Sequence, residues 1–178
     1  LLAQKFTVKP GPDDATTFRV QRDLAVCYCD VGRAAEALHD PWWIFGGAAL
    51  ALYGMEALHV PDVDVLCSPR DARRLIQALG GEIEPDPGEG LFRSRVFGHA
   101  TPGRMRIEVM AEMDVRSGGD WTPVVFATRQ AFDIPDAAGD PVRVFTPVPQ
   151  EHICVSRQFG RPKDLQRAEA LERLISRP

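Results

Sequence analysis

The stretch WWIFGGAALALYGMEALHVPDVDVLCSP constrains the fold more than any other part of the sequence. It opens on four bulky apolar residues, a length typical of a short buried strand. Gly46 and Gly47 follow as a turn, and residues 48–58 are mostly good helix formers. Residues 62–67 then form a second apolar run that is typical of a strand. The sequence therefore predicts a strand, a glycine turn, a helix and a second strand in immediate succession.

The glycine pair between strand and helix has two possible explanations. Without a Cβ atom, the backbone amides of Gly46 and Gly47 can approach a phosphate closely, and the start of a helix favours negative charge. The pair can therefore bind phosphate. The alternative is steric, because strand-to-helix turns often require glycine for the backbone conformation alone.

Asp62 and Asp64 alternate with Val63 and Val65 in the second apolar run. On a strand, positions two apart point to the same face, so both carboxylates leave one face while both valines enter the core. A divalent cation would relieve the repulsion between the carboxylates, and Mg²⁺ takes a few carboxylate oxygens together with water and substrate phosphates. The alternative is a solvated edge strand, or a pair engaged in capping and salt bridges.

A third carboxylate is expected if the aspartate pair holds metal. The segment RIEVM supplies Glu108 in the same alternation, so it is expected to face the pair from a neighbouring strand. Four arginines alternate around it, namely Arg93, Arg95, Arg104 and Arg106. They either bind substrate phosphate or balance the carboxylates.

The rest of the chain predicts one domain over residues 18–178, after a leader or loop over residues 1–17 that is rich in proline and aspartate. The expected elements are a helix at 18–38, a helix at 70–79 capped by Ser68, a hairpin of 91–101 with 103–113, and a helical tail broken near 160–162. Beyond that break, the expected buried face comprises Leu165, Ala168, Leu171, Leu174 and Ile175. The residues expected in the core include Trp42, Trp43, Met105, Met110 and Met113.

The strand, glycine pair, helix, Asp-x-Asp and later apolar-acid-apolar strand resemble the nucleotidyltransferase superfamily with the polymerase β-like fold. The tail, PQEHICVSRQFGRPKDLQRAEAL, looks like the ending of small bacterial members related to the AbiE-type toxins and to lincosamide and aminoglycoside nucleotidyltransferases. Arg161, Lys163 and Asp164 match the Arg-x-Lys-Asp segment of such proteins. The resemblance covers residues 44–174. It implies an α+β (α/β) fold, with a small mixed β-sheet flanked by helices, an N-terminal helix and a C-terminal helical segment.

The resemblance also implies an activity. A nucleoside monophosphate would pass from a nucleoside triphosphate to a hydroxyl of a small molecule, a protein or a tRNA end. Two Mg²⁺ ions would be held by Asp62 and Asp64, with Glu108 completing the second site or acting as base. Gly46, Gly47 and Lys163 would bind the nucleotide, although Lys163 can equally be an exposed lysine beside Asp164. The alternatives are a toxin–antitoxin interaction module with an antitoxin-like protein partner, and a non-catalytic nucleotide-binding protein.

The sequence departs from the superfamily pattern in one region. Many relatives carry an arginine and a threonine just before the first aspartate, where this chain has Leu58, His59, Val60 and Pro61. The spacer of residues 48–61 is also slightly long for the usual pattern. Contacts made by the two missing side chains would be absent or replaced by His59.

Composition limits the environment and the partners. A net charge of −4 and a pI near 5.6 give no bulk attraction to nucleic acid, although a local basic groove can still exist. The four cysteines lack the spacing of a metal or redox site and are expected to be reduced thiols, mostly buried. The sequence has no apolar run long enough for a bilayer and no secretory signal pattern at its start, so we expect a soluble cytoplasmic protein without a membrane partner.

Overall fold

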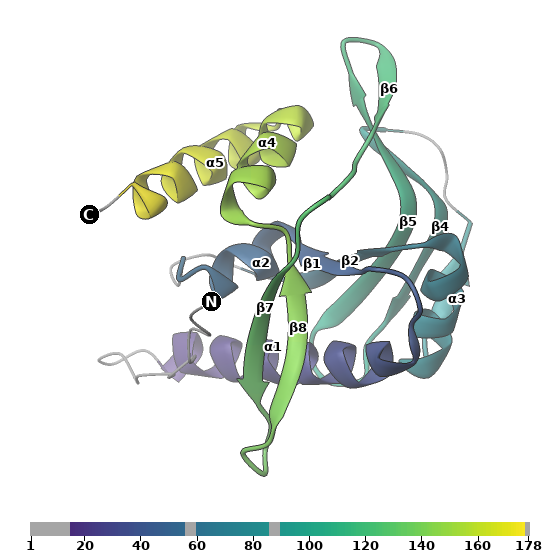
Figure 1. Ribbon diagram of the computed structural model, residues 1–178, viewed down its shortest axis with the longest axis vertical. Helices are drawn as coiled ribbons and strands as arrows, with labels where there is room; N and C mark the ends of the chain where they lie inside the picture. Colours follow the sequence, from purple (N-terminus) through teal and green to yellow (C-terminus); the bar gives the residue numbers. More distant parts are fainter. Residues whose placement is uncertain (1–14, 56–59, 86–89, 177–178) are drawn as a thin grey trace.

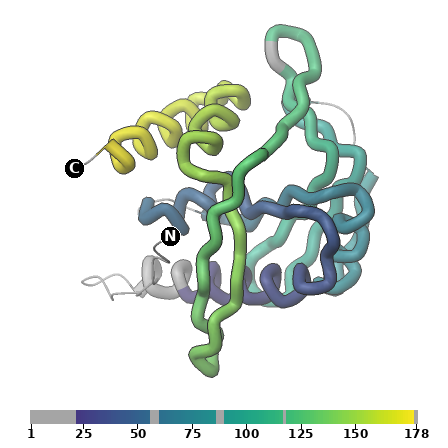
Figure 2. The backbone as a smooth tube through the Cα atoms, viewed as in Figure 1, coloured from purple at the N-terminus to yellow at the C-terminus, as the bar shows by residue number. Residues whose placement is uncertain are grey.

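The computed structural model describes residues 15–55, 60–85 and 90–176 (Figures 1 and 2). Its helices are α1 (Ala15–Ala34), the 3₁₀ helix η1 (Ala35–Ala37), α2 (Gly46–Leu52), α3 (Pro69–Ala78), α4 (Pro149–Phe159) and α5 (Pro162–Ile175). Its strands are β1 (Trp43–Phe45), β2 (Asp62–Cys67), β3 (Glu82–Glu84), β4 (Phe92–Ala100), β5 (Arg106–Ser117), β6 (Asp120–Pro123), β7 (Gln130–Pro135) and β8 (Pro141–Thr146). The fold is α+β, as the sequence predicts.

The main sheet is mixed and has the strand order β1-β2-β5-β4-β3, with β6 also paired to β5. The parallel pair is β2 with β5, whereas β1 with β2 and β4 with β5 are antiparallel. Strands β7 and β8 form a separate antiparallel ribbon, which crosses the front of the molecule in Figure 1. The hairpin expected around Pro102 and Gly103 is therefore confirmed as β4 and β5.

Apolar side chains cover the sheet on both faces. On one face, α1, α3 and β8 pack against the buried valines and isoleucine of β2 and β5, including Val63, Val65 and Ile107. On the other face, α4 contributes Val155 and Phe159 to a second cluster with residues of β1 and β5. Helices α4 and α5 lie side by side at one end of the molecule (Figure 1). These two helices cover only part of the second face, and a cavity remains between α4, α5 and the sheet.

Several predicted boundaries need correction. The first helix begins at Ala15 rather than at residue 18, and residues 1–14 of the expected leader lie outside the described residues. The helix after the glycine pair includes both glycines and ends at Leu52, well before residue 58. It ends there because Tyr53 closes the last turn and Gly54 adopts a positive φ of 96°. The cap of α3 is confirmed, since Ser68 Oγ accepts a hydrogen bond from Asp71 N at 3.3 Å.

The expected buried face of the last helix is partly wrong. Ala168 and Leu171 are buried, but Leu165 and Ile175 are 42% and 39% exposed. Leu165 lies about 100° around the helix from the buried Asp164 and so off the face of Ala168 and Leu171, whereas Ile175 is the last residue of α5. Within the described part of the chain, no helix is both long enough and apolar enough to cross a membrane. His59 and Leu58, where the sequence departs from the superfamily pattern, lie outside the described residues.

Candidate active site

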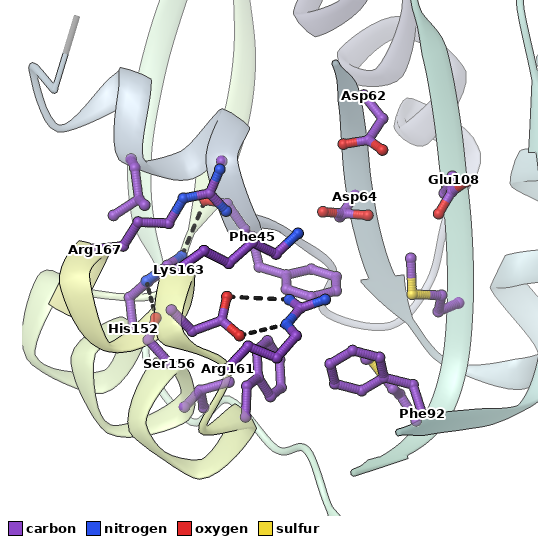
Figure 3. A pocket seen from close by; sticks show the side chains of 18 of the residues that line it. Phe45, Asp62, Asp64, Phe92, Glu108, His152, Ser156, Arg161, Lys163 and Arg167 are labelled. Atoms are coloured by element: carbon purple, nitrogen blue, oxygen red, sulfur yellow. Dashed lines mark hydrogen bonds and ion pairs between the residues drawn. The ribbon is translucent and has the colours of Figure 1, made fainter. Parts of the chain in front are cut away.

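The carboxylates expected from the sequence meet where β2 runs beside β5. The parallel register pairs Asp62 with Arg106 and Asp64 with Glu108. Val63 and Val65 are fully buried, so the two aspartates point from the opposite face of β2, which lines a cavity. Figure 3 shows both aspartates and Glu108 on this face. The strand alternation read from the sequence therefore gives the correct placement of all three side chains.

Asp64 lies at the centre of this group. Burial raises the pKa of Asp64 to about 7, and the nearby charges of Asp62 and Glu108 act in the same direction. The positive charges of Arg161 and Lys163 act in the opposite direction, so both side chains lie within electrostatic range of this carboxyl group. The site therefore concentrates negative charge that is only partly compensated.

Glu108 is already engaged by a cation. Arg106 Nε donates to Glu108 Oε1 at 2.8 Å, and Arg106 Nη2 also lies 4.0 Å from Glu84 Oε2. This pair confirms that one of the four alternating arginines balances the acidic group. Two of the others form ion pairs with carboxylates of β5, since Arg93 pairs with Asp114 and Arg95 pairs with Glu112.

Gly46 is required by the geometry of the turn. Its φ is +63°, and a Cβ atom at this position would collide with Asp64 Oδ2. Gly47 has no positive φ, and a Cβ there would make only ordinary contacts, the nearest being Arg167 Nη2 at 3.5 Å. The steric explanation therefore applies to Gly46, whereas Gly47 has room for a side chain.

A buried histidine of α4 holds the same turn. His152 Nε2 lies 3.2 Å from the carbonyl oxygen of Gly46 and donates to it, and Ser156 Oγ donates to His152 Nδ1 at 3.3 Å. Burial lowers the pKa of His152 to about 4, so the imidazole is neutral near pH 7. The sequence analysis missed both residues. The only sequence signal is their spacing of four, which places them on one face of a helix.

Helix α5 supplies the cations that face the carboxylates. Arg161 forms two contacts with the buried carboxylate of Asp164, Nε–Oδ2 at 2.5 Å and Nη2–Oδ1 at 3.1 Å. Its guanidinium also lies 4.8 Å from the centre of the Phe92 ring, so it links α5 to β4. Lys163 is exposed and lines the cavity, and because Asp164 is bound to Arg161, the ammonium group has no salt bridge among the described residues.

Arg167 is a further residue that the sequence analysis missed. It comes one turn after Lys163 on α5, lines the same cavity and reaches towards Gly47. Figure 3 shows Arg167 and Lys163 extending from α5 on the side of the cavity opposite Asp62 and Asp64. Arg70 and Arg74, by contrast, form contacts with Asp40, Asp71 and His39 and do not line this cavity.

These residues line one cavity of about 420 Å³, called here the carboxylate cavity. One wall carries the acidic side chains of β2 and β5, and the opposite wall carries the glycine turn and the cations of α5. The floor is apolar and is formed by Phe45, Phe92, Phe97, Met110, Met113, Phe126, Val155 and Phe159. Met110 and Met113 are buried as expected, but they also line this floor.

The carboxylates can be compared with the needs of a magnesium ion. Among the described residues, no three His, Cys, Asp or Glu side chains are grouped closely enough to hold one ion together. Mg²⁺ in nucleotide sites needs only one or two carboxylates, with substrate phosphates and water completing its shell. Asp62 and Asp64 supply two carboxylates on one face, and their mutual repulsion favours a cation between them. The donor set therefore fits magnesium bound by this pair.

The thiols agree with the sequence analysis. Cys27, Cys29 and Cys67 are buried and Cys154 is exposed, and all four are free. Burial raises the pKa of Cys27 to about 11 and that of Cys67 to about 12, so both are protonated near pH 7. They take no part in the carboxylate cavity.

The fold matches solved structures of nucleotidyltransferases. A Thermotoga maritima protein assigned as a nucleotidyltransferase is 15% identical, with a TM-score of 0.55 over 89% of this chain and 91% of that chain. The antibiotic-resistance factor ANT(2'')-Ia is 14% identical, with a TM-score of 0.50 over 87% of this chain and 89% of that chain. An antigenic nucleotidyltransferase-like protein from Paracoccidioides brasiliensis is 17% identical, with a TM-score of 0.52 over 84% of this chain and 75% of that chain. The sequence matches no protein-family model and no curated protein sequence. The chain therefore has the nucleotidyltransferase fold, as the sequence predicts.

Proposed function

We propose that this protein is a magnesium-dependent nucleotidyltransferase that moves a nucleoside monophosphate from a nucleoside triphosphate to an acceptor hydroxyl. One observation carries the proposal: a single cavity brings the aspartate pair of β2 and Glu108 of β5 opposite a glycine turn and the cations of α5. Carboxylates for metal and cations for phosphate are the two requirements of phosphoryl chemistry. The fold it shares with nucleotidyltransferases supports the same activity.

The donor phosphates are assigned to the wall formed by α5 and the glycine turn. Lys163 is an exposed point charge without a salt bridge among the described side chains, so it is available for a phosphate. Arg167 brings a second cation next to Gly47, whose backbone a phosphate can approach because no Cβ intervenes. His152 keeps the turn in place through the Gly46 carbonyl while remaining neutral.

Asp62 and Asp64 would hold magnesium, with Glu108 completing a second metal position or acting as base. When bound, magnesium supplies charge neutralisation at the triphosphate and a lower pKa for the acceptor hydroxyl. Glu108 is fixed by Arg106 through Oε1, so its Oε2 is the atom that takes the hydroxyl proton. The acceptor oxygen then bonds to the α-phosphorus, the bond from that phosphorus to the bridging oxygen breaks, and pyrophosphate leaves.

The proposed relationship to AbiE-type toxins rests on the resemblance of the sequence alone. The AbiE-type relationship and an antitoxin-like partner are supported only by the tail segment that contains Lys163. A protein-binding module without catalysis would have no need for magnesium-dependent nucleotide binding. Magnesium-dependent nucleotide binding therefore tests the donor site and separates it from a protein-binding module.

The test is calorimetric titration of the four nucleoside triphosphates into the protein, with and without magnesium. We compare the wild type with an Asp62→Asn, Asp64→Asn variant and with a control, Asp120→Asn, Asp140→Asn, which removes two exposed carboxylates outside the cavity. Magnesium dependence is the decisive quantity, because removing the aspartates also removes their repulsion of phosphate. We expect binding that requires magnesium in the wild type and control and loses that requirement in the first variant. Absence of nucleotide binding to the wild type would refute the proposal.

A further inference from the structure

A second cavity, of about 840 Å³, adjoins the carboxylate cavity, and the proposed reaction assigns it no role. The two cavities share Arg93, Ser94, Met113 and Phe126 as lining residues. The second extends from this shared wall to the end of β2, the segment before β1 and the chain that follows β6. No described residue of α5 or of the glycine turn lines it, so the residues assigned to the donor phosphates are confined to the first cavity.

The shared wall exists because β5 departs from strand alternation at Glu112. Val109 and Ala111 belong to the core beneath α1 and α3, whereas Met110 points to the other face. Strict alternation would return Met113 to the face of Ala111, yet it packs with Met110. Glu112 has a φ of +47° and is the only non-glycine residue in the described chain with a positive φ. This conformation redirects Met113 towards the cavities.

Strand β4 changes face at the opposing position, Arg95. Val96 lies in the core beneath α1 and α3, and Phe97 on the cavity side, but Ser94 then lines the cavities instead of alternating away. Arg95 and Glu112 form an ion pair at 3.0 Å across this point. The positive φ of Glu112 is costly, and β4 and β5 change face at the same position. Such strained conformations cluster at functional sites, so the redirected side chains are candidates for a function.

The lining of the second cavity is mostly apolar, and its charged side chains are engaged in ion pairs. Trp43, Leu66, Val124, Val125 and Phe126 provide the apolar surface. Arg93 pairs with Asp114 at 2.7 Å, Arg95 with Glu112 at 3.0 Å, and Asp40 with Arg70 at 3.1 Å. Together with Arg70, the charges of the lining balance, so a polycation or polyanion gains no net attraction there. An uncharged apolar group would release water from the lining.

We propose that the second cavity is the acceptor subsite and that it takes an uncharged molecule with an apolar or aromatic body. Its hydroxyl would enter the carboxylate cavity past the shared residues Met113 and Phe126. This inference rests on the proposed nucleotidyltransferase function, because it is that reaction which calls for an acceptor. It names the class of acceptor, and it excludes polycationic sugars and RNA from this subsite.

The test uses 2-(2-naphthyl)ethanol as the probe and the methionine methyl groups as reporters in NMR, with no nucleotide present. Met113 lies in the shared wall, whereas Met105 lies in the core on the other side of the sheet and serves as the internal control. A Met113→Leu variant assigns the signal. The expected result is a saturable shift of the Met113 signal with none at Met105. Absence of a Met113 shift up to the solubility limit would overturn the proposal.

Two matched variants locate the binding. Val125 is 67% exposed and lines only the second cavity, so Val125→Glu places a charge there without removing a buried side chain. Val26, 47% exposed on α1, gives the control Val26→Glu. We expect probe affinity to fall at least tenfold in the first and to stay within twofold in the second. Equal affinities in both variants would contradict the subsite.

Tobramycin and bulk tRNA serve as the charged competitors in the same assay. Neither is expected to shift the Met113 signal, and a saturable shift from either would contradict the exclusion of charged acceptors. Binding of ATP with magnesium is measured in the same samples and is expected to be unchanged by Val125→Glu. If the wild type binds the probe but does not bind ATP with magnesium, the nucleotidyltransferase proposal is refuted. The second cavity would then remain a binding site for apolar molecules without an assigned reaction.

Discussion

Replacement of His152 by glutamine tests whether the imidazole buried against the glycine turn stays neutral. The imidazole is buried and its pKa is lowered from 6.5 to about 4, so it is neutral in the folded protein at pH 5, where an unfolded chain protonates it. A depressed folded pKa means that this group's contribution is fully present above about pH 6.5. It is lost progressively as the pH falls towards 4. The linkage relation gives a loss of about 2 kcal/mol from this one group between pH 7.5 and pH 5.0.

The assay is urea unfolding of the wild type and of His152→Gln at pH 7.5 and pH 5.0, followed by circular dichroism. Other groups also titrate in this range, so the decisive quantity is the difference between the two proteins in their pH-dependent loss of stability. A glutamine amide can still donate to the Gly46 carbonyl but has no proton to gain. We expect the wild type to lose about 2 kcal/mol more than the variant. His39→Gln, which changes an exposed histidine, is the control and should lose as much as the wild type.

The reasoning is refuted if the wild type and His152→Gln lose the same stability between the two pH values. Such a result would mean that burial does not lower the pKa of His152 and that the folded protein accommodates the protonated imidazole. A direct titration of the His152 ring by NMR gives an independent check. The ring should remain neutral until the pH approaches 4.

Five further substitutions test the cavity wall, the turn and the altered strand. Lys163→Ala should weaken binding of ATP with magnesium about tenfold, the value of one lost charge-assisted contact, with unchanged thermal stability. Gly46→Ala should lower the stability by about 1–3 kcal/mol because of its positive φ, and the collision of the new Cβ with Asp64 should add to this loss. Gly47→Ala should fold normally and bind ATP more weakly. Glu112→Gly should be about 1 kcal/mol more stable than Glu112→Ala, because only glycine adopts this φ without strain.

Each of these predictions has a comparison that can contradict it. Lys163→Ala is measured beside Gln166→Ala, another exposed position of α5, and equal ATP affinities would remove Lys163 from the donor site. Equal stability of the two glycine variants in urea would show that the turn relaxes around a Cβ. Equal stability of Glu112→Gly and Glu112→Ala would show that the positive φ carries no strain.

The sequence predicted those parts of the site that depend on local alternation. Asp62 and Asp64 share a face because β2 has a period of two, and Val63 between them shows which face is buried. Glu108 could be expected beside them because it follows the same pattern in a second strand. The cap at Ser68 was equally local, since the hydroxyl and its partner are three residues apart.

Other features depended on distant contacts and had no local signal. His152 reaches a carbonyl 106 residues earlier in the chain, and nothing in its helix shows that it is buried against the turn. The last helix was predicted to bury Leu165, but its buried face is the one that carries Asp164, Ala168 and Leu171. Glu112 is the extreme case, because glutamate disfavours a positive φ and the packing of Met113 in one cluster with Met110 has no local signal in the sequence.

The structure separates the two explanations of the glycine pair by position. Gly46 is required by φ and by the approach of Asp64, so its presence says nothing about a ligand. Gly47 lies within helix α2 and has space for a Cβ. Glycine in a helix lowers its stability by up to about 1 kcal/mol relative to alanine. Packing gives no reason for that loss. The proposed donor site would give one, because a phosphate bound beside Arg167 would approach the backbone of Gly47.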